Sequence, residues 1–82
     1  MKNQKMHATD LCRAGLFYIH SERVTDPAGN TGTRFVIDTK LTAAQRDFIR
    51  SFNNTILSGA YYRHAPDITY PVVIIMDQPL TA

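Results

Sequence analysis

The sequence has only one cysteine, Cys12, so no disulfide can form within the chain. It also lacks a secretory signal pattern, and it has no apolar run of about 18 residues, the length that a membrane-spanning helix needs. These absences predict a protein of a reducing cytoplasm that has no membrane partner.

Signatures of catalysis and metal binding are missing too. No phosphate loop, HExxH, CxxC or GxSxG pattern occurs. The groups that would have to assemble a metal or nucleophilic site lack ligand spacing, namely Cys12, His7, His20 and His64. Cys12 is more typical of a small buried hydrophobe, and His20 of a half-buried strand residue. The sequence therefore predicts a protein that is not an enzyme and uses no metal, cofactor or small-molecule substrate.

The sequence also has no large excess of positive or negative charge. Nine Lys and Arg against seven Asp and Glu give a net charge of +2. A dedicated nucleic-acid module carries a larger and more clustered positive excess. We therefore expect DNA to be contacted only indirectly or weakly.

What is present is the composition of a folded protein. The chain has 82 residues, of which 44% are hydrophobic and 20% charged, and it has no repeat or low-complexity tract. This composition predicts a single domain over residues 1–82. Residues 1–8 are polar and Met-rich, which favours a flexible or loosely docked terminus.

The first half of the chain predicts a short helical turn and a hairpin. Thr9 and Asp10 are candidate caps for a turn over residues 11–14, which Gly15 would end. The apolar run at 16–20 is typical of a buried strand continuing to about residue 24, although residues 11–20 also fit one helical face. Turn-forming residues at 26–32 then precede a second strand at 34–38.

A helix is predicted from Thr42, because Thr42 and Gln45 match a capping box and Gly59 is a natural stop. Its apolar side chains recur every four residues and would pack on a sheet, namely Ala44, Phe48, Phe52 and Ile56, flanked by Ile49 and Leu57.

After an irregular stretch at 60–70, Pro71 precedes a β-branched run at 72–76 that predicts a third strand. The order β-β-α-β predicts an α+β fold, with a small three-stranded, mainly antiparallel sheet and one amphipathic helix on one face. A right-handed crossover through the helix would make the third strand parallel to the second. Such a sheet has two edges, and at least one is expected to meet a partner, the N-terminal segment or a second copy.

Two groups of residues are candidate partner-binding sites. Adjacent aromatic and basic side chains, as at binding hot spots, occur at Tyr61, Tyr62, Arg63 and His64, although the tyrosines could instead pack over the helix end and a strand edge. Charged and polar side chains opposite the apolar stripe could meet phosphates or carboxylates, or could simply form a solvated helix face: Arg46 and Arg50, with Asp47, Asn53 and Asn54.

The first twelve residues read MKNQKMHATDLC, and the chain has 82 residues. In these features it resembles the Lxc/Bof family of small corepressors of temperate phages. The resemblance implies a non-enzymatic modulator in the host-cell cytoplasm that binds the phage's lysogenic repressor and strengthens its binding to operator DNA.

The residues alone leave three functions open. The first hypothesis is a regulatory adaptor that binds a protein partner. The alternatives are a small protein inhibitor of a host or defence enzyme, and a domain that binds nucleic acid directly through Arg46, Arg50 and Arg63.

Overall fold

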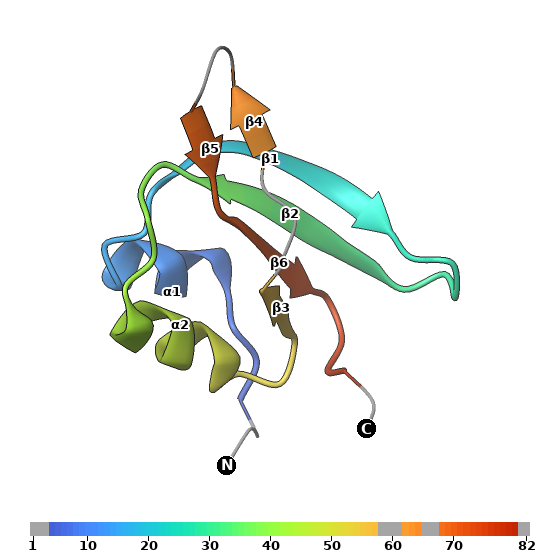
Figure 1. The fold of residues 1–82 in the computed structure, drawn as a ribbon. Helices are drawn as coiled ribbons and strands as arrows, with labels where there is room; N and C mark the ends of the chain where they lie inside the picture. The colour runs from blue at the N-terminus through green and yellow to red at the C-terminus, as the bar shows by residue number, and fades with distance from the viewer. Residues whose placement is uncertain (1–3, 58–61, 65–67, 81–82) are drawn as a thin grey trace.

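The computed structural model describes residues 4–57, 62–64 and 68–80 (Figure 1). Its elements, in chain order, are α1 (Ala8–Arg13), β1 (Tyr18–Thr25), β2 (Thr31–Ile37), α2 (Ala43–Arg50), β3 (Thr55–Leu57), β4 (Tyr62–His64), β5 (Ile68–Tyr70) and β6 (Val72–Met76).

The strands form two sheets. A four-stranded antiparallel sheet has the order β1-β2-β6-β3, and β4 and β5 form a separate antiparallel pair that leads into β6. The α+β class and the antiparallel character of the sheet are therefore confirmed. The prediction of three strands and one helix is corrected to a four-stranded sheet, a second hairpin and two helices.

The predicted parallel pairing of β6 with β2 is wrong. The two strands are antiparallel, with Val36 opposite Val72 and Gly32 opposite Met76. The prediction assumed that α2 alone connects them. Instead, three further strands lie between α2 and β6: β3 just before the stretch at 60–70, and β4 and β5 within it. They reverse the direction of the chain before β6 begins.

The β1–β2 hairpin is confirmed, and its turn forms as the residues predict. The Asp26 carboxylate accepts hydrogen bonds from the backbone N–H groups of Ala28 (3.0 Å) and Asn30 (2.8 Å). Gly29 supplies the positive φ of +90° that this loop requires. These local bonds account for a turn that the sequence alone could predict.

The sequence allowed either a helix or a strand over residues 11–20; the structure has the end of α1 there, followed by the start of β1. Gly15, with a φ of +76°, ends α1 as expected. The helix begins earlier than predicted, because the His7 N–H donates to the Asp10 carboxylate (2.8 Å) and makes His7 the N-cap. Leu11 faces the core, so Cys12 is exposed rather than buried.

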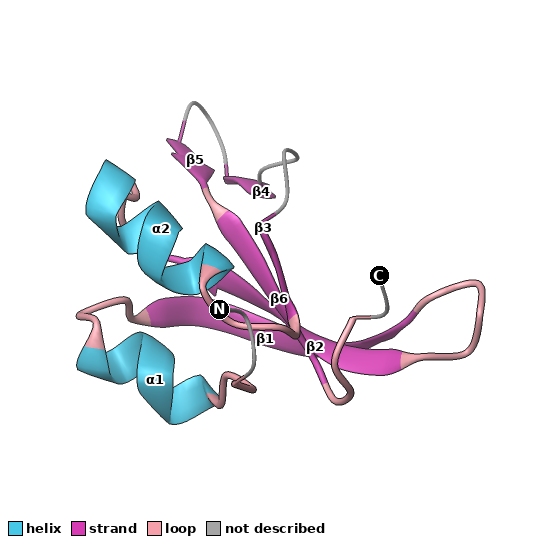
Figure 2. Cartoon of the chain, turned by 90° about the horizontal axis from the view of Figure 1, so that it is seen from below, coloured by secondary structure: helices cyan, strands magenta, loops and turns pink. Residues whose placement is uncertain are grey.

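Both helices pack on one face of the sheet (Figure 2). The core between them joins residues of the N-terminal segment, both helices, the sheet and the connecting loops: Met6, Leu11, Leu16, Phe35, Ile37, Leu41, Ile49, Val73 and Ile75. The expectation of a buried strand from residue 16 is wrong, because only Leu16 of that apolar run is buried, whereas Phe17, Tyr18 and Ile19 are 58%, 43% and 52% exposed. β1 is an edge strand, and it pairs only with β2 within the described part of the chain.

The capping box of α2 is confirmed. The Thr42 hydroxyl accepts from the Gln45 N–H (3.1 Å), and the Thr42 N–H donates to the Gln45 side chain (2.9 Å). The predicted stripe is confirmed only in part, because Ile49 is fully buried and Phe52 packs against the core, whereas Phe48 is 37% exposed. α2 ends at Arg50, so Ile56 and Leu57 belong to β3 instead.

Asn54 explains why α2 ends early. Its side chain is completely buried; Oδ1 accepts from the Met6 N–H (2.7 Å), and Nδ2 donates to the carbonyls of Met6 (3.1 Å) and Met76 (2.8 Å). The Thr55 hydroxyl also donates to the Ile49 carbonyl at the end of the helix (2.6 Å). A continued helix would have placed Asn54 in solvent, so its predicted place on a helix surface is wrong.

The first prediction concerns Asn54. Asn54→Ala should lower the free energy of unfolding by about 3 kcal/mol, because it leaves one buried donor and two acceptors without their partner. Urea unfolding followed by circular dichroism measures this change. Asn53→Ala is the matched control, with an expected loss below about 1 kcal/mol. The buried Oδ1 of Asn53 has no hydrogen-bond partner among the described residues. Equal losses in the two variants would contradict the role given to Asn54.

Candidate protein-binding groove

The sequence-predicted site residues lie in two different parts of the fold. Arg46 and Arg50 are exposed on α2, as expected for its solvent face. Tyr61 lies outside the described residues. Tyr62, Arg63 and His64 form β4, and only their backbone is described, paired with β5. A partner-binding role for these six residues stays a prediction.

A groove that the sequence did not predict lies between the two helices. Its volume is about 620 Å³. In Figure 2, α1 and α2 run side by side on the same side of the sheet, and the start of the described chain lies near one end of the space between them. The lining residues, which we call the interhelix groove, are Gln4, Lys5, His7, Asp10, Arg13, Ala14, Phe48 and Phe52.

The α2 wall of the groove is aromatic. The rings of Phe48 and Phe52 lie 5.2 Å apart, centre to centre, and are nearly perpendicular at 85°. Phe52 packs against the core, whereas Phe48 remains partly open to the groove. Edge-to-face contact holds the Phe48 ring in place. The groove therefore offers a pre-positioned apolar surface to an incoming side chain.

The remaining walls are polar and mostly basic. Arg13, in the last turn of α1, and Lys5, in the N-terminal segment, are the two cations of the lining, and Asp10 is its one carboxylate. That carboxylate already accepts the N–H of His7. The groove thus combines an apolar wall with an excess of positive charge.

The N-terminal segment that forms one wall is tied to the rest of the protein. The Asn53 N–H donates to the Gln4 carbonyl (2.9 Å). Met6 is buried, and both its N–H and its carbonyl are hydrogen-bonded to the Asn54 side chain. Residues 4–6 are therefore held beside the end of α2. The prediction for residues 1–8 rested on their polar composition, which gave no sign of these bonds.

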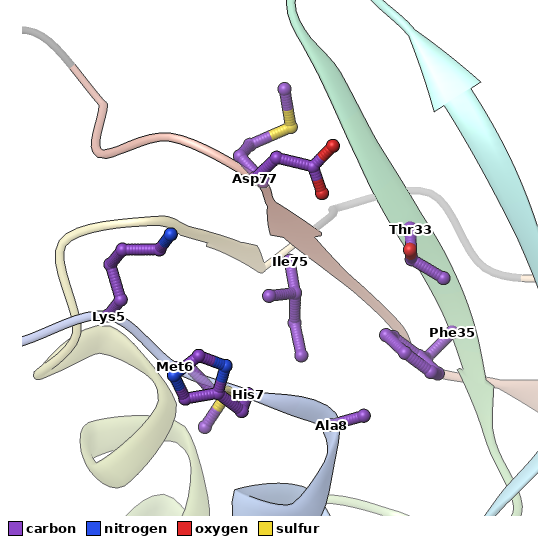
Figure 3. Close-up of a pocket in the computed structure, with 9 residues that line it drawn as sticks. Lys5, Met6, His7, Ala8, Thr33, Phe35, Ile75 and Asp77 are labelled. Carbon is purple, nitrogen blue, oxygen red and sulfur yellow. The ribbon is translucent and has the colours of Figure 1, made fainter.

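A second, smaller cleft opens between the N-terminal segment and the sheet (Figure 3). Its volume is about 280 Å³, and Phe35 and Ile75 provide apolar walls from β2 and β6. Lys5 and Asp77 lie on either side of it, and Lys5 contributes to the lowered pKa of Asp77. The two opposite charges leave this cleft without the electrostatic preference of the interhelix groove.

Asp77 belongs to an ionic cluster at the end of the sheet. Its carboxylate accepts two hydrogen bonds from the Arg23 guanidinium and one from the Thr31 hydroxyl (2.6 Å). The bonds from Arg23, then the bond from Thr31, lower the pKa of Asp77 to about 2. Because Arg23 lies on β1, Thr31 on β2 and Asp77 just after β6, the cluster joins three strands and is best explained as structural.

Two further observations concern other kinds of site. Within residues 4–57, 62–64 and 68–80, no three His, Cys, Asp or Glu side chains come close enough to hold a metal ion. In the same ranges, no helix is both long and apolar enough to span a membrane.

Comparison of the chain with protein-family models, with curated proteins and with solved structures finds no match.

The second prediction concerns Asp77 and pH. The folded pKa is lowered, so the carboxylate stabilises the fold above its unfolded pKa of about 4, and this contribution is lost as the pH falls towards about 2. Asp77→Asn should therefore be less stable than the parent protein at pH 7, and the difference should shrink between pH 4 and pH 2. Urea unfolding at a series of pH values measures it.

Arg23→Gln provides the control, since it removes the largest cause of the lowered pKa of Asp77. The double variant should lose less than the sum of the two single losses, because both changes break the same interaction. Strict additivity, or a difference between Asp77→Asn and the parent that persists unchanged at pH 2, would contradict the assignment.

Proposed function

We propose that this protein is a non-enzymatic regulatory adaptor that binds a protein partner through the interhelix groove. The observation that carries the proposal is the partly exposed Phe48 ring, held against Phe52 in a groove with two cations and one carboxylate. Aromatic side chains, phenylalanine among them, are enriched in the cores of protein–protein interfaces. Basic side chains at the rim would favour a partner with acidic residues.

The groove defines the kind of segment that it would accept. A large apolar side chain of the partner would pack on Phe48, and carboxylates flanking it would meet Lys5 and Arg13. Both cations sit at the exposed surface, where such pairs add selectivity and association rate more than affinity. The apolar contact would therefore supply most of the binding free energy.

The resemblance to the Lxc/Bof family supports a more specific proposal, in which the partner is a phage repressor and the protein acts as its corepressor. The low net charge of +2 is compatible with this role, because the repressor itself would supply most of the phosphate contacts. Preferential binding to the DNA-bound repressor would tighten its complex with the operator. A differential affinity of about 2.7 kcal/mol would give a hundredfold effect.

Arg46 and Arg50 would form a contact zone separate from the groove. Arg46 and Arg50 lie on an exposed part of α2, at helical positions roughly opposite Phe48. They would meet a second surface of the repressor or the DNA beside it, and a contact through Tyr61, Tyr62, Arg63 and His64 stays a prediction from the sequence. Reversing the charge of Arg46 tests this zone, whereas reversing the charge of Arg13 tests the groove.

The third prediction is a titration of operator DNA with the phage repressor, with and without this protein. The parent protein should raise the apparent affinity of the repressor about tenfold or more. Phe48→Ala should remove most of this increase, because it removes the apolar wall of the groove. Arg13→Glu should lower it by a smaller factor, because it reverses the charge at the exposed rim. Gel shifts or fluorescence anisotropy at fixed salt would measure the effect.

Arg46→Glu is the matched control for Arg13→Glu, since it places the same charge reversal on an exposed helix residue outside the groove. If Arg46→Glu lowered the increase more than Arg13→Glu did, or if Phe48→Ala left it unchanged, the groove would be the wrong surface. Unchanged repressor affinity with the parent protein would remove the corepressor proposal.

Two other outcomes would point to the alternatives. Retention of bare operator DNA by this protein alone, falling steeply as salt rises, would indicate direct binding of nucleic acid. Recovery of an enzyme that loses activity on binding this protein would indicate an inhibitor.

A further inference from the structure

The interhelix groove and the smaller cleft of Figure 3 have a common boundary. The smaller cleft, which we call the sheet cleft, lies between residues 5–8 and the strands β2 and β6. Lys5 and His7 line both cavities. The two cavities therefore lie on either side of the same short stretch of chain, and a partner that fills one of them reaches the edge of the other.

The side chains along this stretch alternate between the core and the surface. Met6 is 1% exposed and is held by Asn54, whereas Lys5 and His7 are exposed. The backbone of His7 is extended, with φ −113° and ψ 159°. Because successive side chains of an extended chain point to opposite sides, those of Lys5 and His7 point outwards. They form the crest of a ridge between the two cavities.

Each cavity offers an apolar surface on its own side of the ridge. In the interhelix groove this surface is the partly exposed ring of Phe48. In the sheet cleft it is a small apolar floor formed by the side chains of Phe35 and Ile75 (Figure 3). The sheet cleft, at about 280 Å³, is the smaller of the two and suits an aliphatic side chain better than an aromatic one.

The charges around the ridge differ in how far the protein already engages them. The carboxylates of Asp10 and Asp77 both accept hydrogen bonds within the protein. The side chains of Lys5 and Arg13 make no hydrogen bond or ion pair with another described residue, and Lys5 acts on Asp77 only at longer range. The charges left to a partner are therefore positive.

We propose that the partner segment crosses this ridge and occupies both cavities. One apolar side chain packs on Phe48, a second enters the sheet cleft, and acidic residues between them lie beside Lys5. The inference rests on the proposed function, because it takes the interhelix groove as the first contact. It adds the sheet cleft as a second contact and specifies the partner as a segment in which two apolar residues flank acidic ones.

The width of the ridge sets the spacing of the two apolar residues. The ridge is one extended stretch of chain wide, so the cavities on its two sides are separated by about two strand spacings, or about 10 Å. A partner in the polyproline II conformation rises about 3.1 Å per residue and has three residues per turn. Its positions i and i+3 therefore point to the same side and lie about 9 Å apart, with two acidic residues between them.

The fourth prediction concerns the peptide acetyl-Phe-Asp-Asp-Leu-amide and its reverse, acetyl-Leu-Asp-Asp-Phe-amide, since the ridge can be crossed in either direction. At least one of them should bind the full-length protein and shift the amide NMR signals of residues in both cavities, such as Phe48 and Thr33. Replacing Leu by Ala in that peptide should weaken binding at least about fivefold, because it removes the side chain in the sheet cleft. Replacing both Asp by Asn should weaken it by a smaller factor, because the cations are exposed.

A variant of the protein tests the sheet cleft alone. Ala8→Trp places a large side chain there, because Ala8 lines that cavity and not the interhelix groove. It should lower the affinity for the Leu peptide to that for the Ala peptide. Thr9→Trp is the matched control, since Thr9 is the next exposed residue of α1 and lines neither cavity. It should change the affinity less than about twofold.

Equal binding of the Leu and Ala peptides, with shifts confined to the interhelix groove, would overturn the inference. It would leave the groove as a site for a single apolar side chain, so the proposed function would stand. Absence of binding by both peptides at about 10 mM, tenfold above a millimolar dissociation constant, would also overturn the inference. The operator titration with Phe48→Ala decides separately whether the groove binds the repressor.

Discussion

The buried side chain of Asn54 joins the N-terminal segment to the sheet, a connection that β-pairing does not supply. It bonds the backbone of Met6 in the N-terminal segment and the carbonyl of Met76 at the end of β6, while its own carbonyl accepts from the Met76 N–H. A buried amide with satisfied partners stabilises and specifies a structure, and one without them destabilises it. Asn54 thus fixes three features together: the end of α2, the start of β3 and the docking of residues 4–6. Because those residues form a wall of the interhelix groove, the groove depends on the same side chain.

This dependence explains which parts of the fold the sequence could predict. The capping box of Thr42, the Asp26 turn and the strand after Pro71 were predicted, because each is determined by residues close together in the chain. The end of α2 was not, because Asn54 is held by Met6, 48 positions away, and by Met76, 22 positions away. A polar residue after an amphipathic helix gives no local sign that it will be buried.

The candidate site was harder to predict than the fold. Spacing of four residues grouped Phe48 with Phe52 as core side chains, but the helix turns Ile49 to the core and leaves Phe48 on the groove wall. An apolar stripe defines the buried face of a helix only to within one neighbouring position. Which of two adjacent side chains is buried depends on where the rest of the fold, including α1, lies. Arg13 gave no signal either, because its role depends on α1 lying beside α2. The exposed positions of Arg46 and Arg50, by contrast, follow from the helix alone.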